Sequence, residues 1–259
     1  MSHLVALMYH AIYADETELK AIPEEDKPYA ISTEQFERHL EILRLNKIPI
    51  LLPDAITETP SHGVILTFDD GDKSFYRHAY RILQKLGHKG LFFISTDLID
   101  QRDDFCTWGE LKEMAEAGMH IQCHGQTHRF FDDLSEQESS LEFSTAKKRL
   151  QEQTGQPVHA ISFPGGRYTK RDIRIGKSLG YTTFYTSDIG TLNLDKAKQN
   201  EPLPRLAIRQ STSEPEFLKM ASADSRYIRK ETFKYRLKQL IKKILGNRLY
   251  HNLYKAVTG

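Results

Sequence analysis

The stretch VILTFDDG, residues 64–71, determines how the rest of this 259-residue chain is interpreted. Its first five residues form a short apolar run, which is typical of a strand that is buried on both faces. Two adjacent carboxylates, Asp69 and Asp70, follow directly. Residues 73–86 then carry apolar side chains at helical spacing. We therefore predict a buried strand that brings two carboxylates to its carboxyl end, followed by a helix.

The same alternation of apolar runs and amphipathic stretches extends in both directions along the chain. Repeated strand–helix units imply parallel strands that are covered by helices. We predict an α/β fold, specifically a distorted or incomplete (β/α) barrel of about seven parallel strands. The other predicted strands are 4–9, 90–95, 120–123, 160–163, 181–185 and 206–209, and the other predicted helices are 33–46, 107–117, 135–154, 169–179, 214–222 and 228–245.

The composition is that of an ordinary soluble domain, with 39% hydrophobic and 27% charged residues. No stretch approaches the roughly 20 apolar residues that a membrane-spanning helix needs. The first residues lack the basic start, apolar stretch and cleavage site of a signal peptide. The two cysteines, Cys106 and Cys123, do not form a disulfide framework and suit a reducing compartment. We therefore expect a cytoplasmic location.

Charge divides the chain into a body, residues 1–224, and a basic tail, residues 225–259. The tail holds ten Lys and Arg residues and one acidic residue, giving a formal charge of +9, whereas the body carries −8. Apolar residues alternate with these charges, which predicts a basic amphipathic helix that lies on the inner face of an anionic membrane. The alternative is that its apolar face packs on the barrel. Nucleic-acid binding is not expected, since the body is acidic and contains no recognition motif.

Polar groups follow several of the predicted strands, where barrel enzymes carry their chemistry. Carboxylates, imidazoles and glycine backbone N–H groups would thus meet at one mouth of the barrel. The groups are Asp69 and Asp70 after 64–68, His124 and His128 after 120–123, Pro164, Gly165 and Gly166 after 160–163, and His10 after 4–9.

A metal site is the simplest interpretation of two of these clusters. Asp70, His124 and His128 would supply one carboxylate and two imidazoles, and would leave positions open for water and substrate. The spacing of the histidines would allow them to share one face of a helical turn. Asp69 would remain free to accept a proton from water. The donor set suits a divalent ion, with Zn as the leading choice and Co, Ni, Mn or Fe as alternatives.

Each cluster alone has a simpler interpretation. Asp-Asp-Gly is commonly a turn or a helix cap. Two histidines four residues apart are often ordinary surface residues. Their joint occurrence at strand ends of one α/β pattern favours the metal site.

At this point the sequence resembles the polysaccharide deacetylase family, the NodB-homology domain of carbohydrate esterase family 4. The resemblance rests on the TFDDG motif at 67–71, GLFFI at 90–94, the stretch 117–128 with its two histidines, and Trp108. It covers roughly residues 1–220. It implies that Asp69 is the catalytic base and that Asp70, His124 and His128 bind the metal. It also implies that the backbone at Pro164-Gly165-Gly166 helps to bind the oxyanion.

Four positions depart from the usual family pattern. Ser162 and Gly165 stand where the family often has an arginine and an aromatic residue, and Gly125 replaces the usual Ser or Thr after the first histidine. The late Leu-x-His motif, which supplies the acid histidine, is missing from the last predicted strand, 206–209. This combination resembles the permuted branch of poly-N-acetylglucosamine deacetylases, where the acid comes from a Tyr-His pair on the first strand. His10 is therefore the expected acid, with a structural histidine as the alternative.

The same branch is similar to this chain at Pro204-Arg205-Leu206. We expect Arg205 to enter the site from the last strand and to substitute for the missing arginine near Ser162. The alternative is an ordinary surface arginine.

The resemblance implies a metal-dependent hydrolase that removes N-acetyl groups from an amino sugar and releases acetate. The substrate would be an N-acetylated glycan of the cell envelope or, if the tail meets a membrane, a lipid-linked or lipopolysaccharide-type sugar. The motifs leave two alternatives open. One is an O-acetyl esterase or a deacetylase of a non-sugar amide, and the other is a non-catalytic carbohydrate-binding relative.

Overall fold

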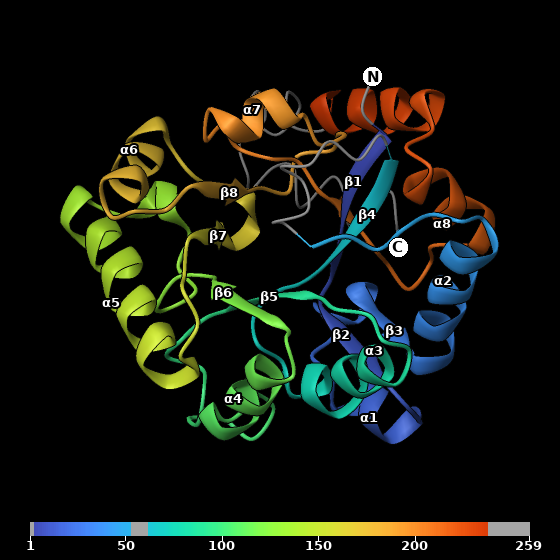
Figure 1. Ribbon diagram of the computed structural model, residues 1–259, viewed down its shortest axis with the longest axis horizontal. Helices are drawn as coiled ribbons and strands as arrows, with labels where there is room; N and C mark the ends of the chain where they lie inside the picture. The colour runs from blue at the N-terminus through green and yellow to red at the C-terminus, as the bar shows by residue number, and fades with distance from the viewer. Residues whose placement is uncertain (1–2, 53–61, 238–259) are drawn as a thin grey trace.

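The computed structural model describes residues 3–52 and 62–237, and they form a curled sheet enclosed by helices (Figure 1). Seven strands pair in the order β8-β7-β6-β5-β4-β1-β9, and every pair is parallel. The predicted incomplete barrel of about seven parallel strands is thus confirmed. The strands are β1 (His3–Tyr9), β4 (His62–Phe68), β5 (Leu91–Ile94), β6 (His120–Cys123), β7 (Ala160–Ser162), β8 (Thr183–Tyr185) and β9 (Leu206–Ala207).

The helices lie around the outside of this sheet (Figure 1). The longer ones begin at residues suited to capping: Thr107 and Ser135 each form a capping box with a glutamate three residues later. Gly155, with φ of +71°, ends the longest helix. The helices around the main sheet are α2 (Thr33–Leu45), α3 (Arg81–Lys85), α4 (Trp108–Glu116), α5 (Glu136–Thr154), α6 (Lys170–Ser178), α7 (Leu194–Lys198) and α8 (Glu214–Ala221).

The two faces of the strands bury different sets of side chains. Leu4, Ala6 and Ile65 belong to a small inner cluster, enclosed by the curl of the sheet. Val5 and Leu7, which alternate with Leu4 and Ala6 along β1, belong to the larger cluster that packs under the helices. This alternation follows from the two-residue period of a strand, and it decides which residues at the strand ends face the mouth of the barrel.

The predicted helix at 73–86 is observed as a helical stretch over residues 73–85, but its middle part is not a regular α-helix. A π-helical segment, η3 (Phe75–Tyr80), precedes the short helix α3. Its buried residues are Phe75, Ala79 and Tyr80, so the contacts with the core recur after four and five residues. Over two turns, apolar spacing in the sequence does not separate an α-helix from the wider π form.

The segment between β1 and α2 contains structure that the sequence pattern did not predict. Two three-residue strands, β2 (Ala11–Tyr13) and β3 (Ala30–Ser32), pair in parallel beside the main sheet. Between them lie α1 (Glu16–Ala21) and η1 (Lys27–Tyr29). The other short 3₁₀ turns are η4 (Phe131–Asp133) and η5 (Pro164–Gly166).

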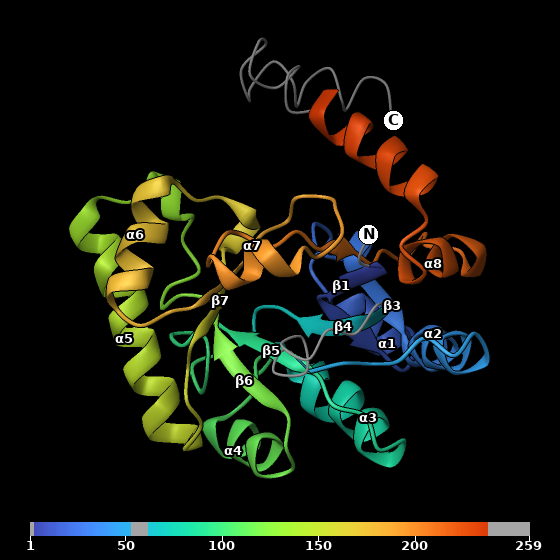
Figure 2. The same ribbon diagram turned by 45° about the horizontal axis from the view of Figure 1, so that its top comes forward.

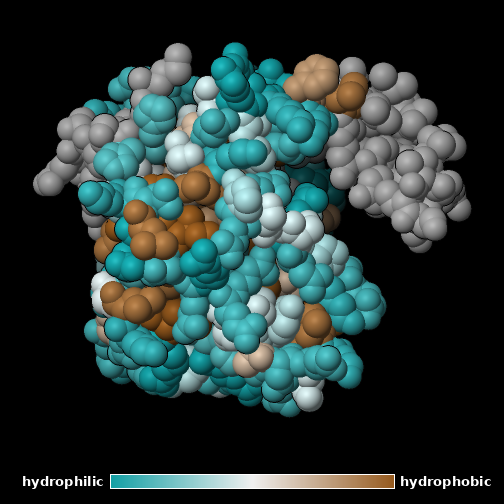
Figure 3. All heavy atoms as spheres, turned by 90° about the vertical axis from the view of Figure 1, so that its right-hand side faces the viewer, coloured by the Kyte–Doolittle hydropathy of each residue, from teal (hydrophilic) through white to brown (hydrophobic). Residues whose placement is uncertain are grey.

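A last helix covers residues 225–237 and lies at the top edge of the molecule after α8 (Figure 2). The predicted helix 228–245 thus begins three residues earlier than expected, and its part beyond 237 lies outside the described residues. None of the helices in the described ranges is long and apolar enough to cross a membrane. The side that carries α2 and α8 is mostly hydrophilic, with scattered apolar patches (Figure 3).

Candidate metal and catalytic site

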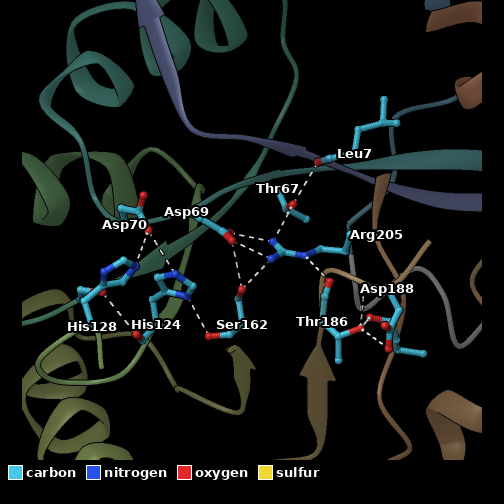
Figure 4. A network of polar contacts seen from close by, with 12 residues as sticks. Leu7, Thr67, Asp69, Asp70, His124, His128, Ser162, Thr186, Asp188 and Arg205 are labelled. Carbon is cyan, nitrogen blue, oxygen red and sulfur yellow. Dashed lines mark hydrogen bonds and ion pairs between the residues drawn. The ribbon is translucent and has the colours of Figure 1, made fainter. Parts of the chain in front are cut away.

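Strand alternation assembles the site. Along β4, Ile65 faces the inner cluster, so Thr67 and Asp69 continue on the same side of the strand. The residues His124 after β6 and Ser162 at the end of β7 follow the same rule. These side chains therefore meet at the carboxyl ends of neighbouring strands, where chemistry is expected in this class of fold (Figure 4).

Asp70, His124 and His128 form a compact cluster. Asp70 Oδ1 lies 3.1 Å from His124 Nε2 and 3.0 Å from His128 Nε2. One donor atom from each residue lies within 4.8 Å of the other two. Burial alone would raise the pKa of Asp70, but hydrogen bonds from both histidines hold it well below its usual value. The side chains of Asp70 and His128 are partly exposed, so the cluster opens toward solvent.

The hydrogen bonding of His124 tests whether these groups suit a cation. Its Nδ1 lies 2.7 Å from the Ser162 carbonyl oxygen, which can only accept, so Nδ1 carries the hydrogen. In the neutral ring, Nε2 then presents a lone pair to the carboxylate of Asp70. Two acceptors at 3.1 Å need a positive charge between them, either a proton or a metal ion. Two imidazole nitrogens and one carboxylate fit a catalytic divalent metal.

Backbone conformation explains how adjacent residues 69 and 70 face different groups. Asp70 has φ of +82° and His128 has φ of +63°, both in the left-handed region. Such a conformation costs an L-residue about 1–2 kcal/mol. It rotates Asp70 out of the alternation of β4 and toward the histidines. Unusual backbone of this kind often accompanies functional sites.

The expectation that His124 and His128 share a face of a helical turn is wrong. Residues 124–128 form an irregular bend. Gly125, with φ of +85°, and His128 both lie in the left-handed region, which a right-handed helix excludes. The two imidazoles nevertheless converge, with ring centroids 5.2 Å apart, because the bend folds the chain back on itself.

Asp69 is held by Arg205, which lies just before β9. Two guanidinium nitrogens contact its two carboxylate oxygens at 2.6 Å each. Both residues are almost fully buried, with exposed fractions of 2% and 1%. Burial would raise the pKa of Asp69, but the charge and hydrogen bonds of Arg205, together with His124 and His10, outweigh it, and the pKa is lowered. The structure therefore places Arg205 inside the site and not on the surface.

Neutral groups complete the surroundings of the guanidinium. It donates to the hydroxyls of Ser162 at 2.7 Å and Thr67 at 3.1 Å, and to the carbonyl of Thr186 at 3.1 Å. Ser162 Oγ also lies 3.1 Å from Asp69 Oδ2. The residue at position 162, where the family often has an arginine, thus contacts an arginine from another strand. Sequence analysis assigned no role to Thr186 or to Thr67, although Thr67 belongs to the TFDDG motif, because such hydroxyls are common in any strand.

His10 follows β1 and lines a cavity of about 520 Å³ together with Asp70 and His128. Its ring lies 5.1 Å from that of Tyr29. Its Nδ1 is buried and has no hydrogen-bond partner among the described residues. A charge on His10 would lower the pKa of both Asp69 and Asp70. The structure thus brings His10 to the metal cluster.

The wall of this cavity comes largely from the segment between β1 and α2. Asp26 and Tyr29 come from this segment, and Leu98 and Phe105 come from the chain after β5. Sequence reasoning missed this wall, because three-residue strands and single turns leave no measurable periodicity.

Gly165 and Gly166, which follow β7, both adopt left-handed backbone conformations that favour glycine. Gly165 has φ of +60°, and a Cβ there would lie 2.8 Å from a ring carbon of Phe130. A Cβ on Gly166 would lie 2.6 Å from the backbone nitrogen of Ser187. The ring of Phe130 thus leaves no room for a side chain at position 165, where the family often has an aromatic residue.

Comparisons with known proteins agree on one family. Residues 57–184 match the family model described as polysaccharide deacetylase. The chain is 28% identical over 200 residues to a Bacillus subtilis (strain 168) protein named "Putative polysaccharide deacetylase YxkH", covering 74% of this chain and 67% of that protein. It is 25% identical over 201 residues to the poly-beta-1,6-N-acetyl-D-glucosamine N-deacetylase of Escherichia coli (strain K12), covering 61% of this chain and only 29% of that enzyme.

The structural comparison extends over most of the chain. The deacetylase PplD of Streptococcus pyogenes, solved in complex with acetate, superimposes with a TM-score of 0.74 and 27% identity. The match covers 84% of this chain and 97% of PplD. The chain therefore belongs to the polysaccharide deacetylase family.

Proposed function

We propose that this protein is a metal-dependent hydrolase that removes N-acetyl groups from an amino sugar in a polysaccharide or glycolipid and releases acetate. The arrangement of two adjacent carboxylates carries this proposal: Asp70 converges with two histidines, and Asp69 is fixed by Arg205 beside them. Membership of the polysaccharide deacetylase family supports the reaction class.

Asp70, His124 and His128 would hold the metal, with Zn as the leading choice and Co, Ni, Mn or Fe as alternatives. When bound, such an ion polarises the acetyl oxygen and lowers the pKa of coordinated water from about 15.7 to about 7. The Ser162 carbonyl keeps the His124 ring oriented and its Nε2 free for this purpose.

Asp69 is the proposed base. Its lowered pKa keeps it ionised at neutral pH, so it is able to accept the proton of the attacking water. The low pKa also makes it a weak base, which suffices only because the water is acidified. Arg205 holds both carboxylate oxygens and is proposed as a positioning residue.

His10 is the proposed acid, because the amine leaving group of an amide needs a proton. Its ring lines the same cavity as Asp70 and His128, and its buried Nδ1 has no partner among the described residues. The backbone N–H of Gly165, in the turn formed by Pro164, Gly165 and Gly166, is proposed to stabilise the oxyanion.

Acetate release from the zinc-loaded full-length protein tests the proposal. The assay uses N-acetylglucosamine oligomers, their O-acetylated counterparts and a non-sugar acetamide. We expect preference for the N-acetyl oligomers. Preference for the O-acetyl esters or the acetamide would support the first alternative, and zinc binding without any acetate release would support a non-catalytic carbohydrate-binding relative.

His10→Ala separates amide from ester chemistry. An alcohol leaves more readily than an amine, so loss of the acid should slow N-acetyl release about 10²-fold or more and affect O-acetyl release far less. Equal losses on both substrates would remove the acid role from His10.

We also propose that the helix 225–237 contacts an anionic membrane on its cytoplasmic face and brings the site to a lipid-linked sugar. Tyr227 and Ile228 pack against the core, so part of the tail covers the barrel. Farther along, Phe233 and Leu237 have exposed fractions of 68% and 47%. The basic residues of the tail complement an anionic surface.

Vesicle binding tests this contact. We expect Phe233→Ser combined with Leu237→Ser to weaken binding to anionic vesicles at least tenfold. Leu45→Ser is the matched control, since Leu45 is 56% exposed and lies on α2. Equal binding of all three proteins would contradict the membrane contact.

A further inference from the structure

A buried carboxylate on α5 holds the loop between the two metal-site histidines. Glu142 is 5% exposed. Its Oε2 accepts hydrogen bonds from the backbone N–H groups of Gln126 at 2.6 Å and Thr127 at 2.9 Å. Its Oε1 accepts from the hydroxyl of Thr127. All three donors belong to the residues between His124 and His128.

The opposite side of the loop is held as well. The carbonyl oxygens of Gly125 and Gln126 accept from the backbone N–H groups of Thr96 at 3.3 Å and Asp97 at 2.9 Å. Glu142 thus binds the N–H groups of the loop, while the chain after β5 binds its carbonyl groups. The path between the two histidines is determined before any ion binds.

Gly125 is the geometric counterpart of Glu142. A Cβ at position 125 would lie 2.9 Å from Glu142 Oε2, a distance that real Cβ atoms essentially never show. The carboxylate therefore occupies the space of a side chain at 125. This contact and the left-handed φ of +85° together explain why glycine stands where the family usually has Ser or Thr.

Packing alone does not explain a carboxylate at this position. Two of its neighbours on the buried face of α5, Phe143 and Ala146, are apolar. No ion pair involving Glu142 occurs within residues 3–52 and 62–237. A buried carboxylate is costly unless hydrogen-bonded, and here the bonds come from the loop.

We infer that Glu142 is a positioning residue for the metal site, with Gly125 as its required partner. It acts by preorganising the bend that brings His128 to His124 and Asp70. Groups that orient metal ligands typically contribute about 10- to 100-fold to metal affinity. The inference rests on the proposed metal site of the preceding section.

Zinc titration of the metal-free full-length protein, followed by calorimetry, is the first test. Glu142→Gln preserves shape but presents an NH₂ group or a weaker acceptor to the loop, and we expect its zinc affinity to fall about 10- to 100-fold. Glu152→Gln is the control, because Glu152 lies on the same helix with its side chain 59% exposed. Glu142→Asp keeps the charge and should recover part of the affinity; it also serves if the glutamine variant does not fold.

Amide hydrogen exchange without metal is the second test. We expect Glu142→Gln to accelerate exchange at residues 125–127 and to leave the interior of α5 protected. A role limited to packing would instead accelerate exchange in α5. This measurement does not depend on zinc, so failure of the wild-type protein to bind zinc would defeat the proposed function and leave the loop inference separately testable.

A double-mutant cycle tests the pairing. We expect Gly125→Ala to lower zinc affinity at least tenfold in the wild-type protein. In the Glu142→Ala background the loss should be at least threefold smaller, because the steric contact is gone and only the strain of the left-handed φ of +85° remains. Additive effects would overturn the pairing. Unchanged zinc affinity and unchanged loop exchange in Glu142→Gln would overturn the positioning role.

Discussion

Asp69 and Asp70 are neighbours in the sequence, yet they lie in different surroundings. Asp69 follows the strand alternation into the barrel and meets a guanidinium, whose charge is permanent. Asp70 turns away through a left-handed backbone and meets the Nε2 atoms of two imidazoles. One carboxylate is thereby kept ionised and oriented, and the other is available to a metal. A single φ angle therefore separates the proposed base, Asp69, from the proposed metal ligand, Asp70.

Asp69→Asn should show the largest effect. Loss of a general base costs about 10²- to 10⁴-fold, so acetate release should nearly disappear while zinc affinity stays within about threefold of wild type. Acetate assays and zinc calorimetry on the same preparation measure both. Full activity in this variant would refute the proposed mechanism.

Asp70→Asn should give the converse pattern. Removing one anionic ligand should abolish tight zinc binding, and activity should fall with it and return in part at high zinc concentration. His124→Ala should behave in the same way. If either variant bound zinc as wild type does, the distinction between the two carboxylates would be lost.

Arg205→Ala should change the stability of the protein and the pKa of Asp69 and leave the cluster of Asp70, His124 and His128 intact. Breaking a buried pair typically costs about 3–5 kcal/mol of stability, which urea unfolding measures. Without the guanidinium, burial raises the pKa of Asp69, so the acid-side limb of the rate profile should move to higher pH. Zinc affinity should change little. Unchanged turnover and an unchanged pH profile would withdraw Arg205 from the site.

The sequence predicted the parts of this site that depend only on where each strand ends and on which side chains alternate along it. Strand ends and their alternation were readable from apolar runs, and they carry Asp69, Asp70, His124 and His128. The contacts around Arg205 were not readable, since Arg205 and Asp69 are 136 residues apart and their pairing depends on the closure of the sheet. The bend at 124–128 was mispredicted, because the spacing of two histidines says nothing about backbone handedness. Glu142 also escaped notice, since a glutamate in a polar helix is unremarkable until its burial is known.

Ser162→Ala should show the smallest effect. It gives the sharpest test of whether the surroundings of Asp69 and those of Asp70 act independently. Its hydroxyl contacts Arg205 and Asp69, whereas its backbone carbonyl accepts from His124 and is unaffected by the substitution. We expect a loss of stability of about 1 kcal/mol, a small upward shift of the acid-side limb and no change in zinc affinity. Urea unfolding, a pH–rate profile and zinc calorimetry provide the readouts. A fall in zinc affinity would show that the two halves of the site are coupled through β7, because the only group removed lies on the Asp69 side.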